Sequence, residues 1–225
     1  MQVVVAKKFL NPQDRVLIVD GDLPAAAGYV KAHFAPGNRV LCFEEELPLY
    51  QGCAPLAYGR EDNVESLSAG LFASACVKGV QSQKICATVK HYCANNQETN
   101  RYTNNSQVSE RAMREIYLRG FEICVKEADP WTIMSSYNRI NGQHTSESYE
   151  LLTEITRNEW GFKGMVTTDW WTRGEHYKEL LAGNDLKMAT GYPERLLAAV
   201  EAGVLTREEM EVCVKRILGV ILWLD

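Results

Sequence analysis

The 225-residue sequence contains no apolar run of the roughly 18–20 residues that a membrane-spanning helix requires. It also has no excess of basic residues, because 24 Lys and Arg oppose 29 Asp and Glu and give a formal net charge of −5. An acidic chain lacks the positive field that attracts nucleic acid. The first apolar stretch is too short for a signal-peptide core, and its lysines lie on the wrong side. We therefore expect neither a membrane nor a nucleic-acid partner.

Paired cysteine motifs are missing as well. The chain has seven cysteines, an odd number, and none of them forms a CxxC motif, which excludes zinc ribbons and thioredoxin-type centres. Cys86, Cys124 and Cys213 lie in apolar runs, where a free cysteine behaves as a small hydrophobic residue. These features predict a reducing, cytoplasmic location, and no metal or cofactor.

The sequence does contain an alternation of strand and helix patterns. With 46% hydrophobic and 24% charged residues, its composition is that of an ordinary globular domain. Short apolar runs predict strands at 15–20, 38–44, 84–93, 131–138, 164–169 and 184–189. Helices are predicted at 23–34, 63–80, 109–127 and 151–160, after Pro193, and after a capping box formed by Thr206 and Glu209. Apolar strands separated by helices indicate a parallel sheet that is buried on both faces.

The predicted architecture is an α/β fold of the (β/α)8 TIM-barrel type. The chain is long enough, because such barrels take about 200–250 residues. Only six strands can be recognised, so we expect a barrel that is truncated or rearranged at its N-terminus. No linker is evident, and residues 1–225 are predicted to form a single domain with an atypical β-α-β start at 1–60.

Polar residues follow several of the predicted strands, at the ends where barrel enzymes carry their chemistry. Lys90 and His91 lie near the end of one strand, and Asp169 ends another, directly before Trp170 and Trp171. The asparagine-rich loop at 95–107 adds neutral donors and acceptors, which suit a ligand rich in hydroxyl groups. The alternative interpretations are a solvated strand end for Lys90 and His91, and a helix N-cap for Asp169.

Five motifs in order then resemble glycoside hydrolase family 3, in its β-glucosidase branch, over roughly residues 64–225. They are KHYCANNQETNR (90–101), SERAMREIYLRGFEICVKE (109–127), IMSSYNRINGQHTSES (133–148), LLTEITRNEWGFKGMVTTDWW (151–171) and GNDLKM (183–188). The resemblance implies a retaining glycosidase that hydrolyses a β-glucoside or an oligosaccharide.

The resemblance also implies roles for individual residues. Asp169 matches the nucleophile that forms a covalent glycosyl-enzyme. The residues that match sugar-binding or subsite positions are Lys90, His91, Arg101, Tyr137, Trp170 and Met188. Glu98 lies with Arg101 in the NNQExxR loop, which is expected to shape the subsite.

The sequence departs from the family pattern in three places. The acid/base of the β-glucosidase branch is a glutamate on a second α/β domain, which we expect to be absent from this chain. The loop KHYCANNQE lacks the second histidine that serves the single-domain hexosaminidase branch. Near the N-terminus, Asp20 and Arg60 are candidates for a sugar-binding aspartate and arginine, although the spacing is compressed. The alternative is that residues 1–60 form an unrelated element.

These departures leave the source of the acid open. The candidates within the chain are Glu98, Asp20 and Glu175, and the alternatives are a second copy of the chain or a separate chain. A competing interpretation is a non-catalytic, sugar-binding or vestigial domain that keeps the nucleophile without its acid.

Overall fold

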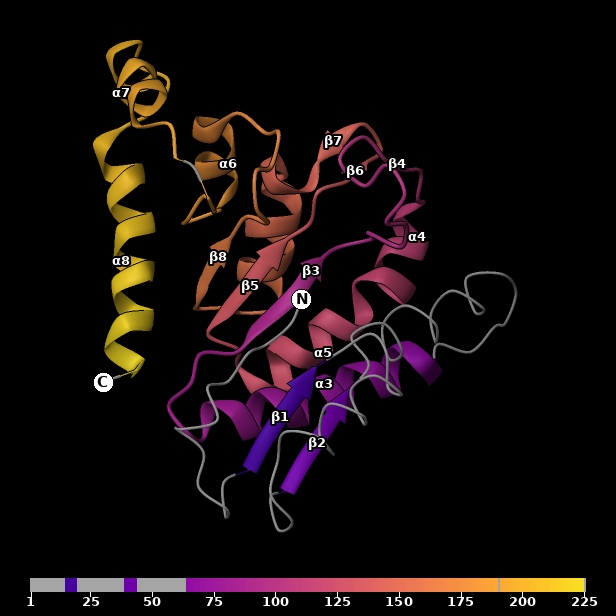
Figure 1. The fold of residues 1–225 in the computed structure, drawn as a ribbon. Helices are drawn as coiled ribbons and strands as arrows, with labels where there is room; N and C mark the ends of the chain where they lie inside the picture. Colours follow the sequence, from indigo (N-terminus) through magenta and orange to yellow (C-terminus); the bar gives the residue numbers. More distant parts are fainter. Residues whose placement is uncertain (1–14, 20–38, 44–63, 190, 225) are drawn as a thin grey trace. The chain divides into compact units, whose positions relative to one another are not determined.

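A computed structural model describes residues 15–19, 39–43, 64–189 and 191–224 (Figure 1). It divides into two compact units, Met1–Glu65 and Ser66–Asp225. In the first unit, β1 (Arg15–Val19) and β2 (Arg39–Phe43) pair in parallel. Both strands were predicted from their apolar runs, whereas the helix expected at 23–34 lies outside the described residues. The assignment of residues 1–225 to a single domain stays a prediction.

The second unit is built on a parallel sheet with the strand order β3-β5-β8 (Figure 1). Its strands are β3 (Thr88–Tyr92), β5 (Thr132–Ser135) and β8 (Met165–Thr167). Thr88 pairs with Thr132, and Thr132 pairs with Met165, so all three strands run in one direction. Their carboxyl ends therefore meet at a single edge, as the sequence predicted for a parallel sheet.

The strand expected at 184–189 is reduced to a single bridge between Thr167 and Leu186. The residues before Leu186 use their side chains to bind neighbouring segments. The Asp185 carboxylate accepts the Val166 backbone N–H at 2.8 Å, and the Asn184 amide donates to the Ser146 carbonyl. This polar bonding takes the place of a longer ladder and attaches the segment to β8.

Helices surround the sheet in the order in which the sequence predicts them. They are α3 (Val64–Gln81), α4 (Glu110–Ala112), α5 (Arg119–Ala128), α6 (His176–Ala182), α7 (Pro193–Glu201) and α8 (Arg207–Leu224). Two π-helical segments, η3 (Met113–Tyr117) and η5 (Glu150–Glu159), and a 3-10 turn, η4 (Thr145–Glu147), complete the set. The helix predicted at 109–127 is therefore divided into α4, η3 and α5, and α6 was not predicted.

Two of the predicted helices begin with side-chain caps. The Ser109 hydroxyl accepts the Ala112 N–H at 3.3 Å at the start of α4. Before α8, the Thr206 N–H donates to the Glu209 carboxylate at 2.8 Å, while the Glu209 N–H donates to the Thr206 hydroxyl at 3.2 Å. This reciprocal pair is the capping box, in which each residue satisfies a backbone donor of the other.

The hydrophobic core lies between the sheet and its helices. Ile133, Val166 and Leu152 are completely buried, and each contributes about 1.5–3 kcal/mol by leaving water. Helices α3 and α5 approach closely at Gly70 and Gly120, where a Cβ on Gly70 would lie 3.0 Å from the Gly120 carbonyl oxygen. The lack of a side chain at these two glycines therefore allows α3 and α5 to pack this closely.

A second small sheet contains β4 (Asn105–Ser106), β6 (Arg139–Ile140) and β7 (Gln143–His144). It orders the end of the loop that the sequence marked as irregular. The Asn141 side chain bonds both the N–H and the carbonyl of Val108, and the Asn105 side chain accepts the Gly142 N–H. Asparagine amides thus replace backbone partners that a two-residue strand cannot supply.

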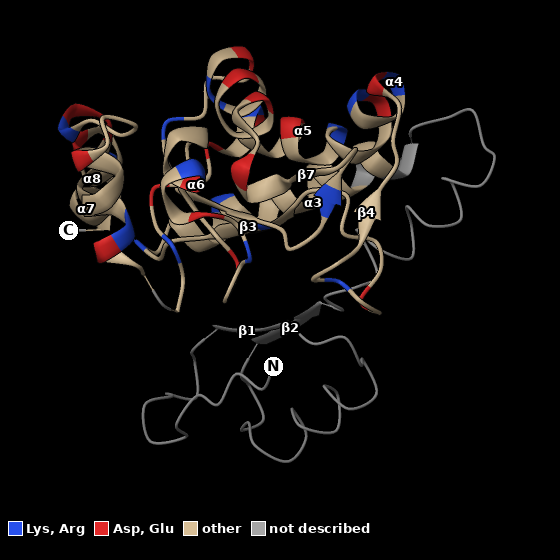
Figure 2. Ribbon diagram, turned by 90° about the horizontal axis from the view of Figure 1, so that it is seen from above, with Lys and Arg blue, Asp and Glu red and all other residues tan. Residues whose placement is uncertain are grey.

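Acidic and basic residues are interspersed along the helices of the second unit (Figure 2). Several form pairs one helical turn apart, such as Arg111 with Glu115 and Lys126 with Glu122. Exposed pairs of this kind add only a few tenths of a kcal/mol, about 0.3–0.5 each. Among the described residues, no helix combines the length and the apolar character that crossing a membrane would require.

Candidate functional site

Three predicted site residues come together at the carboxyl edge of the β3-β5-β8 sheet. His91 lies near the end of β3, Tyr137 is two residues beyond β5, and Asp169 is two residues beyond β8. The three segments are far apart in sequence, and the parallel register brings their ends to one edge. Side chains from three neighbouring strand ends can therefore act on one ligand.

Asp169 is the central carboxylate of this group and is only 5% exposed. One oxygen, Oδ1, accepts the Trp170 backbone N–H at 2.7 Å, and the other, Oδ2, lies 3.4 Å from Nε2 of His91. The first contact fixes the rotation of the carboxylate, and the second places a donor beside its other oxygen. The carboxylate is therefore oriented from both sides.

Tyr137 supplies a hydroxyl donor beside Asp169. Burial, hydrogen bonding to Tyr102 and the negative charge of Asp169 together raise the pKa of Tyr137. The phenol therefore remains protonated at neutral pH and can donate a hydrogen bond to the carboxylate. The Arg101 guanidinium lies 4.7 Å from the centre of the Tyr137 ring, a cation–π contact that holds the ring in place.

Tyr102 and Arg173 also belong to this group, although the sequence analysis did not single them out. The Tyr102 and Tyr137 rings are 4.4 Å apart between centroids, and Arg173 lies 5.4 Å from the Tyr102 ring. The stack therefore joins the loop after β3 to the loop after β8. An arginine or tyrosine in a polar loop gives no sequence signal for such a contact.

A buried ion pair supports the loop that follows Asp169. Lys187 and Glu179 are almost completely inaccessible and contact each other directly. Lys187 also donates to the carbonyls of Thr172 and Gly174, and the Thr172 hydroxyl donates to Glu179 at 2.8 Å. Both charges are thus hydrogen-bonded as well as paired, which a buried ion pair requires. The pair attaches residues 172–174 to α6 and to the GNDLKM segment.

The remaining predicted residues lie in several places. Lys90 precedes His91 in β3 and is partly buried, and Trp170 follows Asp169 with 45% of its surface exposed. The Met188 backbone N–H donates to the Thr168 hydroxyl, next to Asp169 in the chain. Asp20 and Arg60 lie outside the described residues.

The two described candidates for a general acid bind arginines. Glu98 accepts from Arg101 at 2.8 Å, and Glu175 precedes α6 and lies 3.4 Å from Arg195. Glu175 is therefore at a helix start. Among the described residues, no three His, Cys, Asp or Glu side chains lie close enough together to hold a metal ion.

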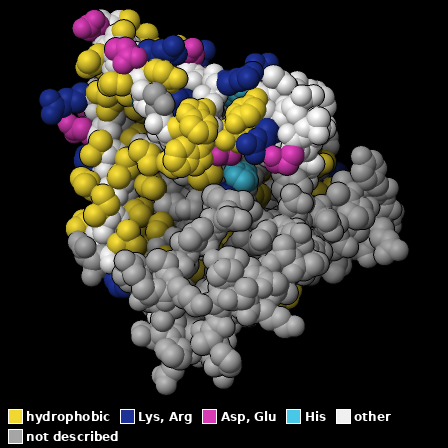
Figure 3. Space-filling model, viewed as in Figure 1, with side chains coloured by type: hydrophobic (Ala, Val, Ile, Leu, Met, Phe, Trp, Pro, Cys, Tyr) yellow, Lys and Arg dark blue, Asp and Glu magenta, His cyan; other side chains and the backbone are white. Residues whose placement is uncertain are grey.

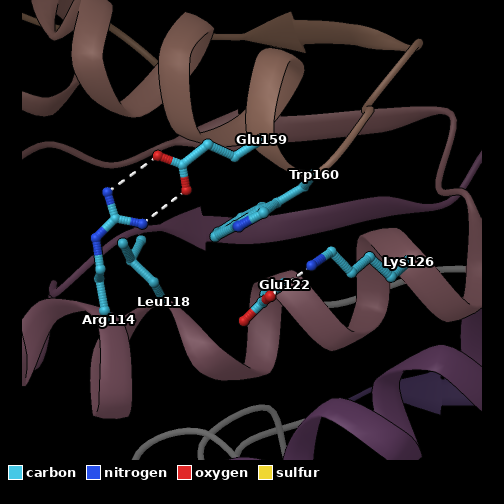
Figure 4. A pocket seen from close by; sticks show the side chains of 6 residues that line it. All are labelled: Arg114, Leu118, Glu122, Lys126, Glu159 and Trp160. Atoms are coloured by element: carbon cyan, nitrogen blue, oxygen red, sulfur yellow. Dashed lines mark hydrogen bonds and ion pairs between the residues drawn. The ribbon is translucent and has the colours of Figure 1, made fainter.

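A surface pocket of about 220 Å³ lies elsewhere, between η3, α5 and the end of η5 (Figure 4). In it, Arg114 forms two hydrogen bonds with Glu159, and Lys126 pairs with Glu122, with the Trp160 indole nearby. The charges bind one another, so this pocket does not share the chemistry of the strand-end site.

Comparison with known proteins identifies the family. Residues 61–220 match the model of the glycosyl hydrolase family 3 N-terminal domain. Beta-glucosidase A of Butyrivibrio fibrisolvens is 55% identical over 143 residues, which are 64% of this chain and 17% of that protein. An exo-alpha-(1->6)-L-arabinopyranosidase of Bifidobacterium longum is 44% identical over 144 residues, 64% of this chain and 19% of the relative. The chain thus spans about a fifth of the length of these relatives.

A solved structure agrees with these relatives. Beta-glucosidase 3B of Thermotoga neapolitana, in complex with glucose, is 44% identical with a TM-score of 0.68, over 79% of this chain and 26% of that chain. The likeness supports a mixed α/β fold for the described part. Together with the family match, it shows that this chain belongs to glycosyl hydrolase family 3.

Proposed function

We propose that this chain is part of a retaining glycoside hydrolase of the β-glucosidase type, with Asp169 as the nucleophile. The observation that carries the proposal is the oriented, buried Asp169 carboxylate at the sheet edge, with His91 and Tyr137 beside it. The parallel β3-β5-β8 sheet would be part of a (β/α)8 barrel, whose reactive groups gather at this edge.

In the proposed reaction, an Asp169 oxygen attacks the anomeric carbon of the substrate. The bond from that carbon to the leaving-group oxygen breaks, and this oxygen takes a proton from a general acid. Water then attacks the same carbon and gives a proton to the deprotonated general acid, which releases the sugar and restores both the carboxylate and the acid. The hydrogen bond from the Trp170 N–H keeps one carboxylate oxygen occupied and directs the carboxylate.

The other site residues would bind the sugar. Lys90, His91 and Arg101 offer N–H donors to hydroxyl groups, and the exposed face of the Trp170 indole can pack against the apolar face of a pyranose. Met188 would lie at the edge of the subsite. Hydrogen bonds of this kind contribute about 1–3 kcal/mol each when one partner is charged.

We propose that the general acid comes from outside the described residues. Glu98 and Glu175 each pair with an arginine, so their carboxylates already have a partner within the chain. The source would be a further segment of a longer protein, a second copy of the chain or a separate chain.

The substrate class can be tested with two aryl glycosides. Two relatives carry the names of a beta-glucosidase and an L-arabinopyranosidase. We expect a nitrophenyl β-glucoside to be cleaved faster than a nitrophenyl α-L-arabinopyranoside, because the overall similarity to the glucosidase is higher. The reverse order would reassign the substrate while retaining the nucleophile.

The nucleophile can be tested by trapping the intermediate. A 2-deoxy-2-fluoro-β-glucoside with a dinitrophenolate leaving group needs little acid assistance, so the chain should acquire one fluoroglucosyl group on the peptide that contains Asp169. Asp169→Asn should prevent the labelling and keep the same thermal midpoint, since asparagine can still accept the Trp170 N–H. Labelling of another residue would overturn the assignment. Glucose binding without labelling would favour the sugar-binding, non-catalytic alternative.

A further inference from the structure

The buried ion pair of Lys187 and Glu179 fixes the backbone on both sides of Arg173. The Lys187 ammonium donates to the Thr172 carbonyl and to the Gly174 carbonyl, each at 3.3 Å. The Thr172 hydroxyl donates to Glu179 at 2.8 Å. A Cβ on Gly174 would lie 2.5 Å from a Glu179 carboxylate oxygen, so the backbone fits closely against the carboxylate. The segment that carries Arg173 is therefore held by groups that solvent hardly reaches.

The Arg173 side chain connects this fixed segment to the proposed site. Its guanidinium lies 5.4 Å from the centre of the Tyr102 ring, and the Tyr102 and Tyr137 rings are 4.4 Å apart. Figure 3 shows basic side chains beside acidic and histidine side chains near the middle of the face that it draws. Because the Tyr137 hydroxyl bonds Asp169, a displacement of Arg173 would pass through two stacked rings to the carboxylate.

Stability alone does not explain why this pair is charged. Two charges that are buried so deeply lose their hydration, and apolar residues of similar volume often stabilise a fold as well or better. Apolar residues cannot, however, donate hydrogen bonds to two carbonyls of one loop. Besides Glu179, the Lys187 ammonium contacts Thr172 and Gly174, the two neighbours of Arg173. The charge thus provides a fixed loop geometry.

We propose that Lys187 and Glu179 are positioning residues for the reaction at Asp169. They fix Arg173, and Arg173 holds the stacked rings that place the Tyr137 phenol beside the nucleophile. This inference rests on the proposed glycosidase function. Both side chains are almost inaccessible, so they act on the reaction only through these contacts. A displacement of about 1 Å at a reacting group can lower the rate by about 10²-fold.

The decisive variant combines Glu179→Gln with Lys187→Met. Glutamine keeps an oxygen that can accept from Thr172 and Ser146, and methionine fills the space of the lysine chain without its charge. No charge is then buried alone, so the thermal midpoint should stay near the wild-type value. Lys187→Met by itself leaves Glu179 without its partner and should lower the midpoint. Lys178→Met, at an exposed position of the same helix α6, is the matched control.

Two measurements separate positioning from folding. The rate of labelling by the 2-deoxy-2-fluoro-β-glucoside, at saturating reagent, reports the attack by Asp169, and calorimetry with glucose reports binding. We expect the double variant to be labelled about 10- to 100-fold more slowly, with a glucose affinity near that of the wild type. A pair that served only the fold would leave the labelling rate of the folded variant unchanged. Lys178→Met should change neither quantity.

Arg173 provides a test of the route. Arg173→Ala should slow the labelling about as much as the double variant does. Adding it to the double variant should cause little further loss, because both changes break the same series of contacts. Arg173→Lys keeps a cation near the Tyr102 ring and should restore most of the rate. Losses that multiply independently would overturn the proposed route.

The outcomes distinguish this inference from the proposed function. Wild-type labelling in a folded double variant would overturn the roles of Lys187 and Glu179 and leave Asp169 as the nucleophile. If the double variant fails to fold, the exposed Arg173 decides, and an unchanged rate in Arg173→Ala would overturn the inference. Absence of labelling in the wild-type chain would overturn the proposed function and this inference with it.

Discussion

At the scale of single residues, the site depends on how firmly Asp169 is oriented. The backbone of Trp170 contacts one carboxylate oxygen, and His91 lies beside the other. The raised pKa of Tyr137 keeps a protonated phenol next to them. In the proposed reaction, a carboxylate placed in this way would need little rearrangement to attack, which is the advantage of preorganised sites.

Lys90 and His91 allow a residue-scale prediction. Replacing either with alanine should weaken glucose binding by about 1–3 kcal/mol, the range for hydrogen bonds to charged or buried groups. Isothermal titration calorimetry measures the change. Lys78→Ala is the matched control, because Lys78 forms an exposed pair with Glu127 on another part of the chain. Unchanged affinity in both variants would show that Lys90 and His91 have a structural role.

At the scale of secondary-structure elements, Asp185 joins three of them. Its carboxylate binds Arg157 of η5 at 2.7 Å, Arg216 of α8 at 3.0 Å and the Val166 N–H of β8. The Asp185 side chain is fully buried and the Arg157 side chain nearly so. Neither the Asp185 charge nor the Arg157 charge can be exposed to water unless a secondary-structure element moves.

Asp185→Asn should therefore destabilise the fold strongly. Asparagine keeps only one acceptor oxygen and no charge, so it leaves the buried Arg157 charge without its partner, at a cost of about 3–5 kcal/mol. Urea unfolding measures the difference. Glu211→Gln breaks the exposed pair with Arg207 and should leave the unfolding midpoint unchanged. Equal effects of the two substitutions would contradict this account of Asp185.

His176, the first residue of α6, makes the stability depend on pH. Its Nδ1 accepts the Tyr192 N–H at 3.2 Å, which requires an unprotonated nitrogen. Burial and, secondarily, the charge of Lys187 lower the pKa of His176. The folded state thus favours neutral histidine, and this contribution to stability is present above the unfolded pKa of about 6.5. It is lost as the pH falls through the lower, folded-state value.

The corresponding measurement compares thermal midpoints at about pH 7.5 and about pH 5.5. His176→Gln keeps an acceptor but does not titrate, so the variant should lose less stability on acidification than the wild type. An identical loss would assign the acid sensitivity to other groups. His144, whose pKa is also lowered by burial and by Arg139, is the second histidine to test in the same way.

At the scale of the whole molecule, the proposed source of the acid predicts a pattern of activity. The 225-residue chain alone should cleave aryl glucosides with good leaving groups slowly and cellobiose hardly at all. Absence of general acid catalysis costs about 10²–10⁴-fold, and it costs most for poor leaving groups. The pH profile should also lack the basic limb that a titrating acid produces.

Values of kcat/KM for glucosides with leaving groups of graded pKa test this pattern, and a steep dependence is expected. Phenols and alcohols as leaving groups cover the necessary range. Brisk hydrolysis of cellobiose with a flat dependence would mean that the chain or its oligomer contains an acid that remains to be identified.

The sequence predicted the secondary structure where burial determines the pattern of apolar residues. The apolar runs predicted β1, β2, β3, β5 and β8, and the site residues His91, Tyr137 and Asp169 follow such runs. Strands of two residues, such as β6 and β7, are too short to show a periodicity. Helix α6 escaped prediction because its buried positions include Glu179, whose charge conceals the apolar face.

The contacts of Tyr102 and Arg173 could not be predicted for a different reason. The Tyr102 ring and the Arg173 charge meet only after their two loops have folded toward the same strand ends, and the two residues are 71 positions apart in the sequence. No local sequence pattern indicates that these two side chains come into contact. Trp171 was visible in the sequence, but the left-handed backbone that sets it apart becomes apparent only in the structure.

The ion pairs Lys187–Glu179 and Arg101–Glu98 differ in burial, so added salt should affect them differently. Counter-ions cannot approach Lys187 and Glu179, so the anchoring of the loop after Asp169 should be indifferent to ionic strength. Arg101 and Glu98 lie in contact with solvent, where dissolved ions screen their attraction. The salt concentration thus acts on the Arg101 side of the proposed site while the anchoring of the loop after Asp169 is maintained, and the two contributions can be separated without altering any residue.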